Sequence, residues 1–287
     1  MRDMAGMVLR LGLTIGLACA AAPALAWQDI GATPPPMLKF ERILYGGHRQ
    51  GHVALLRPRR AERPPVVIQL PVYPYIDWVG RYSTAWLPSL LFEHGYVYAG
   101  VNRRSSQRIG GAAFVAELAA AIAETLRHAE RFGFDPTRVV LVGQGWGGHS
   151  AALLATDPSY LEAAGVPFGA VKAAVILDGA GLDLIGSQAA ASDFRKKQVS
   201  RFAGSEALSA LSPLNHAPLP NAPRFLIHAL APDEESKTFA AALAAAGTSA
   251  TVVRVAETRS KMTRTHLGAP SNPQSRPLLR FLEEAVR

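Results

Sequence analysis

The sequence predicts an α/β fold, with a mostly parallel central sheet and helices on both faces. Two observations carry this prediction. Short apolar runs alternate along the chain with longer segments of helical periodicity, which is the pattern of strand–helix units in a parallel sheet. The strand candidates are continuous apolar runs, such as VVIQL at 66–70. Runs of this kind predict strands that are buried on both faces.

The first 26 residues are predicted to be a secretory signal peptide. Residues 1–10 carry the basic side chains Arg2 and Arg10, and a run of small and apolar residues follows. An Ala-Leu-Ala pattern at 24–26 supplies a cleavage site. The apolar run is too short and too rich in alanine for a comfortable membrane span. We therefore expect cleavage before Trp27, export to the periplasm or beyond, and no stable membrane span in the mature chain.

Composition limits the domain organisation and the function classes that are possible for the rest of the chain. Residues 27–37 are proline-rich and predict a tether, and 38–287 predict one domain. The single cysteine, Cys19, lies in the signal segment, so the mature chain has no disulfide, and a domain of this size can bury its core without one. The net charge is +8, but the arginines are scattered, which does not indicate nucleic-acid binding. No histidine or cysteine cluster has metal-ligand spacing, and we expect no cofactor.

Eight strands are expected. The first two surround Gly46-Gly47, and the others are apolar runs, several of them bounded by turn residues such as Asp135-Pro136. The predicted strands span 40–45, 52–57, 66–70, 96–102, 138–143, 173–179, 224–230 and 251–256.

Five helices are expected between these strands. The helix 84–94 ends at Gly95, and Val115, Leu118 and Ile122 show helical spacing in the longest one. The predicted helices span 84–94, 112–132, 147–155, 234–246 and 274–286. The segment 184–221 predicts irregular structure that could partly cover a site.

The stretch VLVGQGWGGHSAALLATDP, residues 140–158, predicts a strand, a tight glycine-rich turn and an alanine-rich helix. A nucleophile elbow has this layout, with a serine at the centre of G-x-S-x-G. The central residue here is Gly145, which has no side chain. Because glycine tolerates strained backbone better than serine does, the turn can persist without a nucleophile.

Several stretches, in this order and spacing, resemble the α/β-hydrolase fold and in particular its carboxylesterase and lipase-like members. The likeness covers about residues 38–287. It is carried by DPTRVVLVGQGWGGHSAALLATDP, LFEHGYVYAGVNRRSS, AAVILDGAGLDL, NAPRFLIHALAPDEESKTFAAALAAAG and the closing helix. The resemblance implies acyl transfer by an elbow serine, a histidine base, an orienting carboxylate and backbone N–H donors for the oxyanion.

Matched position by position, most of that machinery is degenerate. Gly145 stands at the serine position. Aligning VAETRSKMTRTHLGAP by its Leu-Gly end puts Ser260 where relatives keep histidine. Asp233 stands at the acid position, where it is a possible retained acid, although an aspartate there could equally cap the helix that follows.

The loop after the 66–70 strand reads PVYPYIDWVG, where esterase relatives place a His-Gly-Gly stretch. Its prolines have no backbone N–H to offer an oxyanion. Its aromatic side chains could line a ligand site or simply pack the loop. The candidate ligand-binding residues are Tyr73, Tyr75, Trp78 and Trp146.

Displaced catalytic residues remain as alternatives. Ser150 follows His149 on the helix after the elbow, but adjacent helix residues do not face each other, and both could be packing residues. His266 lies in the loop that holds Ser260 and could reach the site if this loop folds differently. Asp178, at a strand end, could bind a polar ligand or satisfy backbone N–H groups.

Three hypotheses follow. The first is an exported, catalytically inactive hydrolase homologue that binds a small ligand or a partner near Gly145, since removal of a nucleophile alone lowers the rate by many orders of magnitude. The second is a carboxylic ester hydrolase with a displaced serine nucleophile. The third is an envelope interaction module with a basic surface. Whether the chain is an enzyme stays open here, because fold alone does not establish activity.

Overall fold

The structure is a computed structural model. It describes residues 38–46, 51–58, 61–71, 86–102, 109–190, 193–203, 207–218, 220–230, 234–255 and 267–287. The chain divides into two units, Met1–Pro36 and Met37–Arg287, and every described residue belongs to the second. The predicted signal peptide over 1–26 and tether over 27–37 therefore lie outside the described residues.

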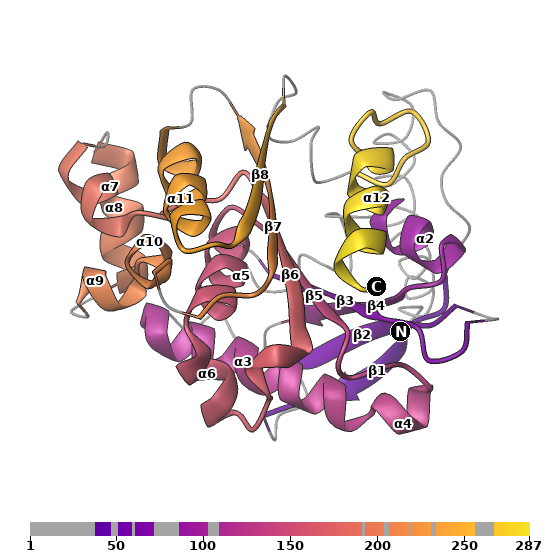
Figure 1. The fold of residues 1–287 in the computed structure, drawn as a ribbon. Coiled ribbons are helices and arrows are strands. Elements are labelled where there is room, and N and C mark those ends of the chain that lie inside the picture. Colours follow the sequence, from indigo (N-terminus) through magenta and orange to yellow (C-terminus); the bar gives the residue numbers. More distant parts are fainter. Residues whose placement is uncertain are drawn as a thin grey trace, which may run out of the picture. The chain divides into compact units, whose positions relative to one another are not determined.

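An eight-stranded sheet forms the centre of the second unit (Figure 1), in the order β1-β2-β4-β3-β5-β6-β7-β8. Strands β1 and β2 are antiparallel to their neighbours, and all pairs from β4 to β8 are parallel. The predicted mostly parallel sheet is confirmed. The strands are β1 (Glu41–Leu44), β2 (His52–Leu56), β3 (Val66–Leu70), β4 (Val97–Asn102), β5 (Val139–Gln144), β6 (Val171–Leu177), β7 (Arg224–Leu230) and β8 (Ser249–Val255).

Helices cover both faces of this sheet (Figure 1). One face packs against α3 (Gly111–Arg127), α5 (Trp146–Thr156) and α11 (Glu234–Ala245) in the larger apolar core. The other packs against α2 (Trp86–Glu93) and α12 (Ser275–Ala285) in a second core. Alternate strand residues serve the two cores, and every residue of β3 is buried. Burial on both faces explains why the strands are apolar throughout.

The structure differs from the prediction in three places. The predicted helix over 112–132 breaks at His128 into α3 and α4 (Ala129–Phe132). The prediction of irregular structure over 184–221 is wrong, because the described residues of that segment form four short helices. These are α7 (Leu184–Ala190), α8 (Asp193–Ala203), α9 (Leu208–Leu211) and α10 (Pro213–His216). The helix α6 (Pro158–Ala163) and the 3-10 turn η1 (Phe168–Ala170) were not predicted.

Candidate functional site at the β5–α5 turn

Gly145 lies between the end of β5 and the start of α5, at the carboxyl end of the parallel strands. In open α/β sheets this end carries the ligand sites. Its backbone angles are φ 52° and ψ −119°. This is a left-handed conformation that side-chain-bearing residues rarely adopt and that clusters at functional sites. The predicted strand, strained turn and helix are all present.

The neighbouring glycines are required by close packing of the turn. A Cβ on Gly143 would overlap the carbonyl group of Gly147. A Cβ on Gly147 would lie 2.8 Å from the carbonyl oxygen of Pro71, at the end of β3. Neither backbone can move aside as a flexible side chain could. Glycine at positions 143 and 147 thus allows the turn to pack directly against the end of β3.

Gly145 itself is not crowded. Among the residues that the structure describes, no atom lies within 4 Å of the position that a Cβ would occupy. The backbone therefore holds an elbow conformation, and no described residue fills the space into which a nucleophile would project. The reactive side-chain atom itself is absent, because residue 145 is glycine.

Hydrogen bonds fix the turn to the end of β6. The Gly145 N–H donates to the carbonyl oxygen of Leu177 at 3.0 Å, and its own carbonyl accepts from the N–H groups of His149 at 2.9 Å and Ala180 at 3.2 Å. Between these partners lies Asp178, which is buried and has φ 49°. Its N–H donates to the carbonyl oxygen of His228 at 2.7 Å. Gly145 and Asp178, which both have a positive φ, therefore lie close together at the carboxyl edge of the sheet, and at Asp178 this conformation is strained.

Ser150 and His149 are both fully buried. The Ser150 hydroxyl donates to the carbonyl oxygen of Trp146 at 3.0 Å. The His149 Nδ1 donates to the carbonyl oxygen of Gly181 at 2.8 Å. Their polar groups thus serve α5 and the loop beside it. This arrangement fits packing residues and offers no path by which Ser150 could reach a substrate.

Trp146 was expected to contribute to a ligand site. Its ring is buried and stacks on Phe202 of α8, with ring centroids 4.5 Å apart and an interplanar angle of 22°. His149 meets the same Phe202 ring edge-on at 4.7 Å. The indole is therefore part of the core between α5 and α8, and little of its surface is left for a ligand.

His228 lies near the carboxyl end of β7, at the same end of the sheet as Gly145, and the sequence did not predict it as a site residue. It is fully buried, and neither ring nitrogen has a hydrogen-bond partner among the described residues. Burial lowers its pKa from 6.5 to about 4. Burial also lowers the pKa of His149 to about 4, and the bond to Gly181 opposes this shift. Both rings are therefore neutral at pH 7.

The other predicted site residues, Tyr73, Tyr75, Trp78, Asp233, Ser260 and His266, lie outside the described residues. Their proximity to Gly145 stays a prediction. In the part of the chain that the structure describes, no group of three or more His, Cys, Asp or Glu side chains could hold a metal ion. No helix in that part has both the length and the apolar character to cross a membrane.

Residues 81–243, which include Gly145, match the BD-FAE family. This chain belongs to the BD-FAE family of esterase-like α/β-hydrolases. No curated protein matches it. Solved structures with the same fold include esterase 2 of the planctomycete Thermogutta terrifontis in its native form, at 20% sequence identity and a TM-score of 0.65, which covers 89% of this chain and 95% of that one.

Two further structures of that esterase are similar to the BD-FAE chain. The propionate-bound form has 20% identity and a TM-score of 0.65, over 88% of this chain and 94% of that one. The form phosphorylated by paraoxon has 18% identity and a TM-score of 0.64, over 88% and 95%. At these identities the likeness shows the α/β-hydrolase fold.

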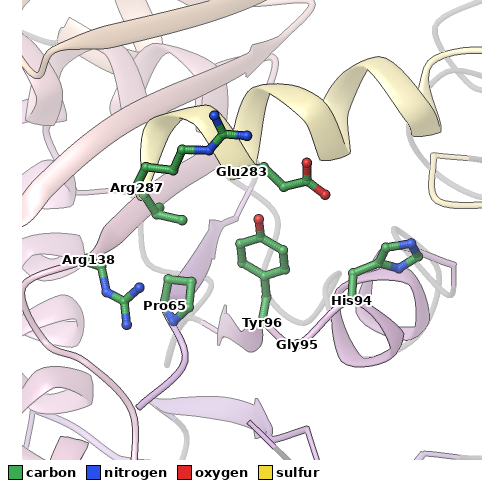
Figure 2. Close-up of a pocket in the computed structure, with 8 residues that line it drawn as sticks. Pro65, His94, Gly95, Tyr96, Arg138, Glu283 and Arg287 are labelled. Carbon is green, nitrogen blue, oxygen red and sulfur yellow. The ribbon is translucent and has the colours of Figure 1, made fainter. Parts of the chain in front are cut away.

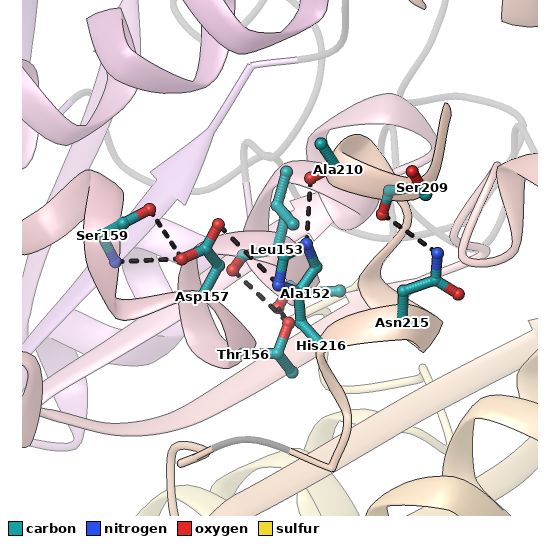
Figure 3. Close-up of polar contacts among 9 residues, drawn as sticks. All are labelled: Ala152, Leu153, Thr156, Asp157, Ser159, Ser209, Ala210, Asn215 and His216. Carbon is teal, nitrogen blue, oxygen red and sulfur yellow. Dashed lines mark hydrogen bonds and ion pairs between the residues drawn. The ribbon is translucent and has the colours of Figure 1, made fainter. Parts of the chain in front are cut away.

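The BD-FAE chain also groups Ser159, Asp157 and His216 (Figure 3), but their contacts are structural. Asp157 caps α6 by accepting from the Ser159 N–H at 3.0 Å and the Ser159 hydroxyl at 2.7 Å. His216 Nε2 is bonded to the carbonyl oxygen of Ala210 at 2.9 Å, and its Nδ1 lies 3.9 Å from the Asp157 carboxylate. The serine donates to the carboxylate rather than to the histidine, so this is not a triad.

A cavity of about 390 Å³ lies at the opposite end of the sheet (Figure 2). Pro65, Tyr96 and Arg138, which line it, directly precede β3, β4 and β5, and Glu283 of α12 closes one side. Burial raises the pKa of Tyr96 to about 12, and Glu283 adds to that shift. The cavity is thus separate from the Gly145 end, and the ligand pocket expected there stays a prediction.

Proposed function

We propose that this BD-FAE chain is an exported esterase homologue that has lost its serine nucleophile and binds a small ligand at the Gly145 end of the sheet. One observation carries the proposal. Gly145 keeps the elbow conformation, and among the described residues nothing fills the space of a nucleophile, but it has no side chain. Acyl transfer by the usual route needs an activated hydroxyl at this point.

The ligand class is suggested by the structural neighbours. Forms of the Thermogutta esterase 2 are bound to propionate and to butyrate. Short-chain carboxylates are products of ester hydrolysis, and a site without a nucleophile could retain them. They are therefore the first ligands to test.

The proposal is tested by labelling with a fluorophosphonate probe, which bonds to an activated serine, and by reading intact mass. We expect no adduct on the wild-type chain under conditions in which a positive-control esterase labels fully. A single stoichiometric adduct on the wild-type chain would overturn the proposal, and mapping the labelled peptide would identify the nucleophile.

Ligand binding has its own readout. Propionate and butyrate should raise the unfolding temperature in a concentration-dependent manner, because a ligand that binds only the native state stabilises it by mass action. Sodium chloride at the same ionic strength is the control. An unfolding temperature that does not respond to either carboxylate, beyond the salt control, would reject this ligand class.

A second candidate is a carboxylic ester hydrolase with a displaced serine. The family and its solved neighbours are esterases, which favours it. Ser150 is a poor choice, because it is buried and bonded to Trp146. Ser260 with His266 is the better pair. If the wild-type chain labels, Ser260→Ala should abolish the adduct and Ser150→Ala should leave it.

A further inference from the structure

Strand β8 is the last strand at one edge of the sheet, as far as the chain is described. It pairs with β7 along its whole length, from Arg224–Ser249 to Leu230–Val255. Six of its seven residues are exposed or half-buried, and only Val255 is buried. The backbone groups on its outer side therefore form a row that another strand can join.

The two edges of the sheet differ in their protection. The opposite edge strand, β1, has four residues and begins with the charged pair Glu41 and Arg42. Strand β8 has seven residues, no proline and a β-branched run of Thr251, Val252 and Val253. Native edges are normally made short, charged or interrupted to prevent pairing. The β8 edge carries a single charge, on Arg254.

We propose that β8 pairs antiparallel with β8 of a second copy of this chain, about a two-fold axis at Val252. In this register Val252 faces its own copy, Thr251 faces Val253, and Ser249 faces Val255. The axis closes the assembly at two copies, because both β8 edges are then paired and neither can bind a third copy.

The side chains suit this register on both faces. Ala250 packs with the core under α11 and Val253 packs with the opposite core, so Val252 lies on the α11 face. It is 36% exposed, which makes it one of the few large apolar side chains that are exposed in the described part of the chain. Pairing would cover it with its symmetry mate. On the other face, Thr251 and Val253 make a β-branched cross-strand pair, which is a favourable one.

Charge also favours a second copy. The only charged side chain of β8, Arg254, falls opposite Ala250 of the second copy, so the two arginines are not opposed. Ala250 lies shortly after α11, which ends at Ala245. Arg254 is thereby brought toward the C-terminal end of α11 of the second copy, where the partial negative charge of the helix favours a cation. The exposed residues Ala244, Ala245 and Ala246 put no bulky or charged group beside this edge.

Cross-linking tests the register. In a Cys19→Ser background, Val252→Cys should form a disulfide-linked dimer under mild oxidation, because directly opposed residues in an antiparallel pair have Cα atoms about 4.5–5.5 Å apart, within disulfide range. Arg254→Cys, two residues away on the same strand face, is the matched control and should cross-link far less. Equal cross-linking of both variants would overturn the register, and no cross-linking of either would overturn the pairing.

Sedimentation tests the assembly in solution. The wild-type chain should show twice the monomer mass at micromolar concentrations, and Val252→Lys should weaken dimerisation about tenfold or more, since two like charges would meet at the axis. Leu44→Lys, at the exposed end of β1, is the control and should leave the dimer intact. A monomeric wild-type chain, or equal loss with Leu44→Lys, would overturn the proposal. The result is independent of the ligand-binding and labelling outcomes.

Discussion

The Nδ1 of His149 donates a hydrogen bond to the carbonyl oxygen of Gly181 at 2.8 Å, which ties α5 to the loop after β6. Since a carbonyl oxygen can only accept, the proton of the neutral ring is on Nδ1. Nε2 then has no proton, and no residue in the described part of the chain donates to it. The neutral His149 ring therefore links α5, the helix that follows the elbow, to the loop after β6.

This state makes the protein sensitive to acid. The pKa values of His149 and His228 fall from 6.5 to about 4 on folding, so the unfolded chain binds more protons between these values. Stability is then full above pH 6.5 and is lost as the pH falls toward 4, by about 3 kcal/mol per histidine at the lower limit. Urea unfolding at pH 7.5 and pH 4.5 should show the loss.

The variant His228→Leu should reduce this acid-induced loss by about half, because one of the two buried titrating rings is gone. At neutral pH it should be tolerated, since neither nitrogen of His228 has a hydrogen bond to a described residue that would be lost. His94→Gln, at an exposed position, is the control. An unchanged pH dependence in His228→Leu would show that acid acts elsewhere in the chain.

Gly145→Ala should destabilise the protein although no described residue lies where the added methyl group would go. The penalty comes from the backbone, because φ 52° with ψ −119° is sparsely populated by residues with a Cβ, and it should be about 1–3 kcal/mol. Gly169→Ala is the matched control, since its Cβ also meets nothing within 4 Å and its φ is not positive. Thermal unfolding should separate the two variants, and equal unfolding temperatures would refute the strain.

The strands and the elbow could be predicted because their signals are local. Apolar runs such as 66–70 and 138–143 mark buried strands wherever they occur, and the spacing of glycines around Gly145 marks a tight turn. The helices α7, α9 and α10 could not be predicted, because pieces of four to seven residues are too short to show a clear period. The helix α6 does have a local signal, because Asp157 is a good N-cap residue and Pro158 favours the first helical position.

The site was less predictable than the fold, because side-chain roles depend on packing between distant segments. The sequence makes Trp146 a candidate ligand-binding residue, but in the structure Phe202 of α8 stacks on its ring. His228 is hidden within the apolar run RFLIHAL, and only the sheet and the core around it make its ring unpartnered. In the sequence Ser150 is a possible displaced nucleophile. In the structure it lies one helical turn after Trp146, and its hydroxyl donates to the Trp146 carbonyl oxygen.

The Trp146–Phe202 stack should be a main support of α8. Phe202 is fully buried and contacts Phe114 and His149 as well as Trp146. Phe202→Ala should lower the free energy of unfolding by about 3–5 kcal/mol, as for other large core aromatics. Phe40→Ala is the control, because Phe40 is 40% exposed and should lose far less. Similar losses for both variants in urea unfolding would contradict a role for the stack.

Asp157 should stabilise α6 as a cap rather than as an ion-pair partner. Its Oδ1 accepts two hydrogen bonds from Ser159, at 3.0 and 2.7 Å, whereas His216 lies 3.9 Å from the other oxygen. Asp157→Ala should lower the free energy of unfolding by about 1–2 kcal/mol, and Asp157→Asn should recover most of it, since asparagine is an equally good cap without the charge. If Asn proves as harmful as Ala, the charge on Asp157 matters more than the hydrogen bonds, and the attraction to His216 is the stabilising contact.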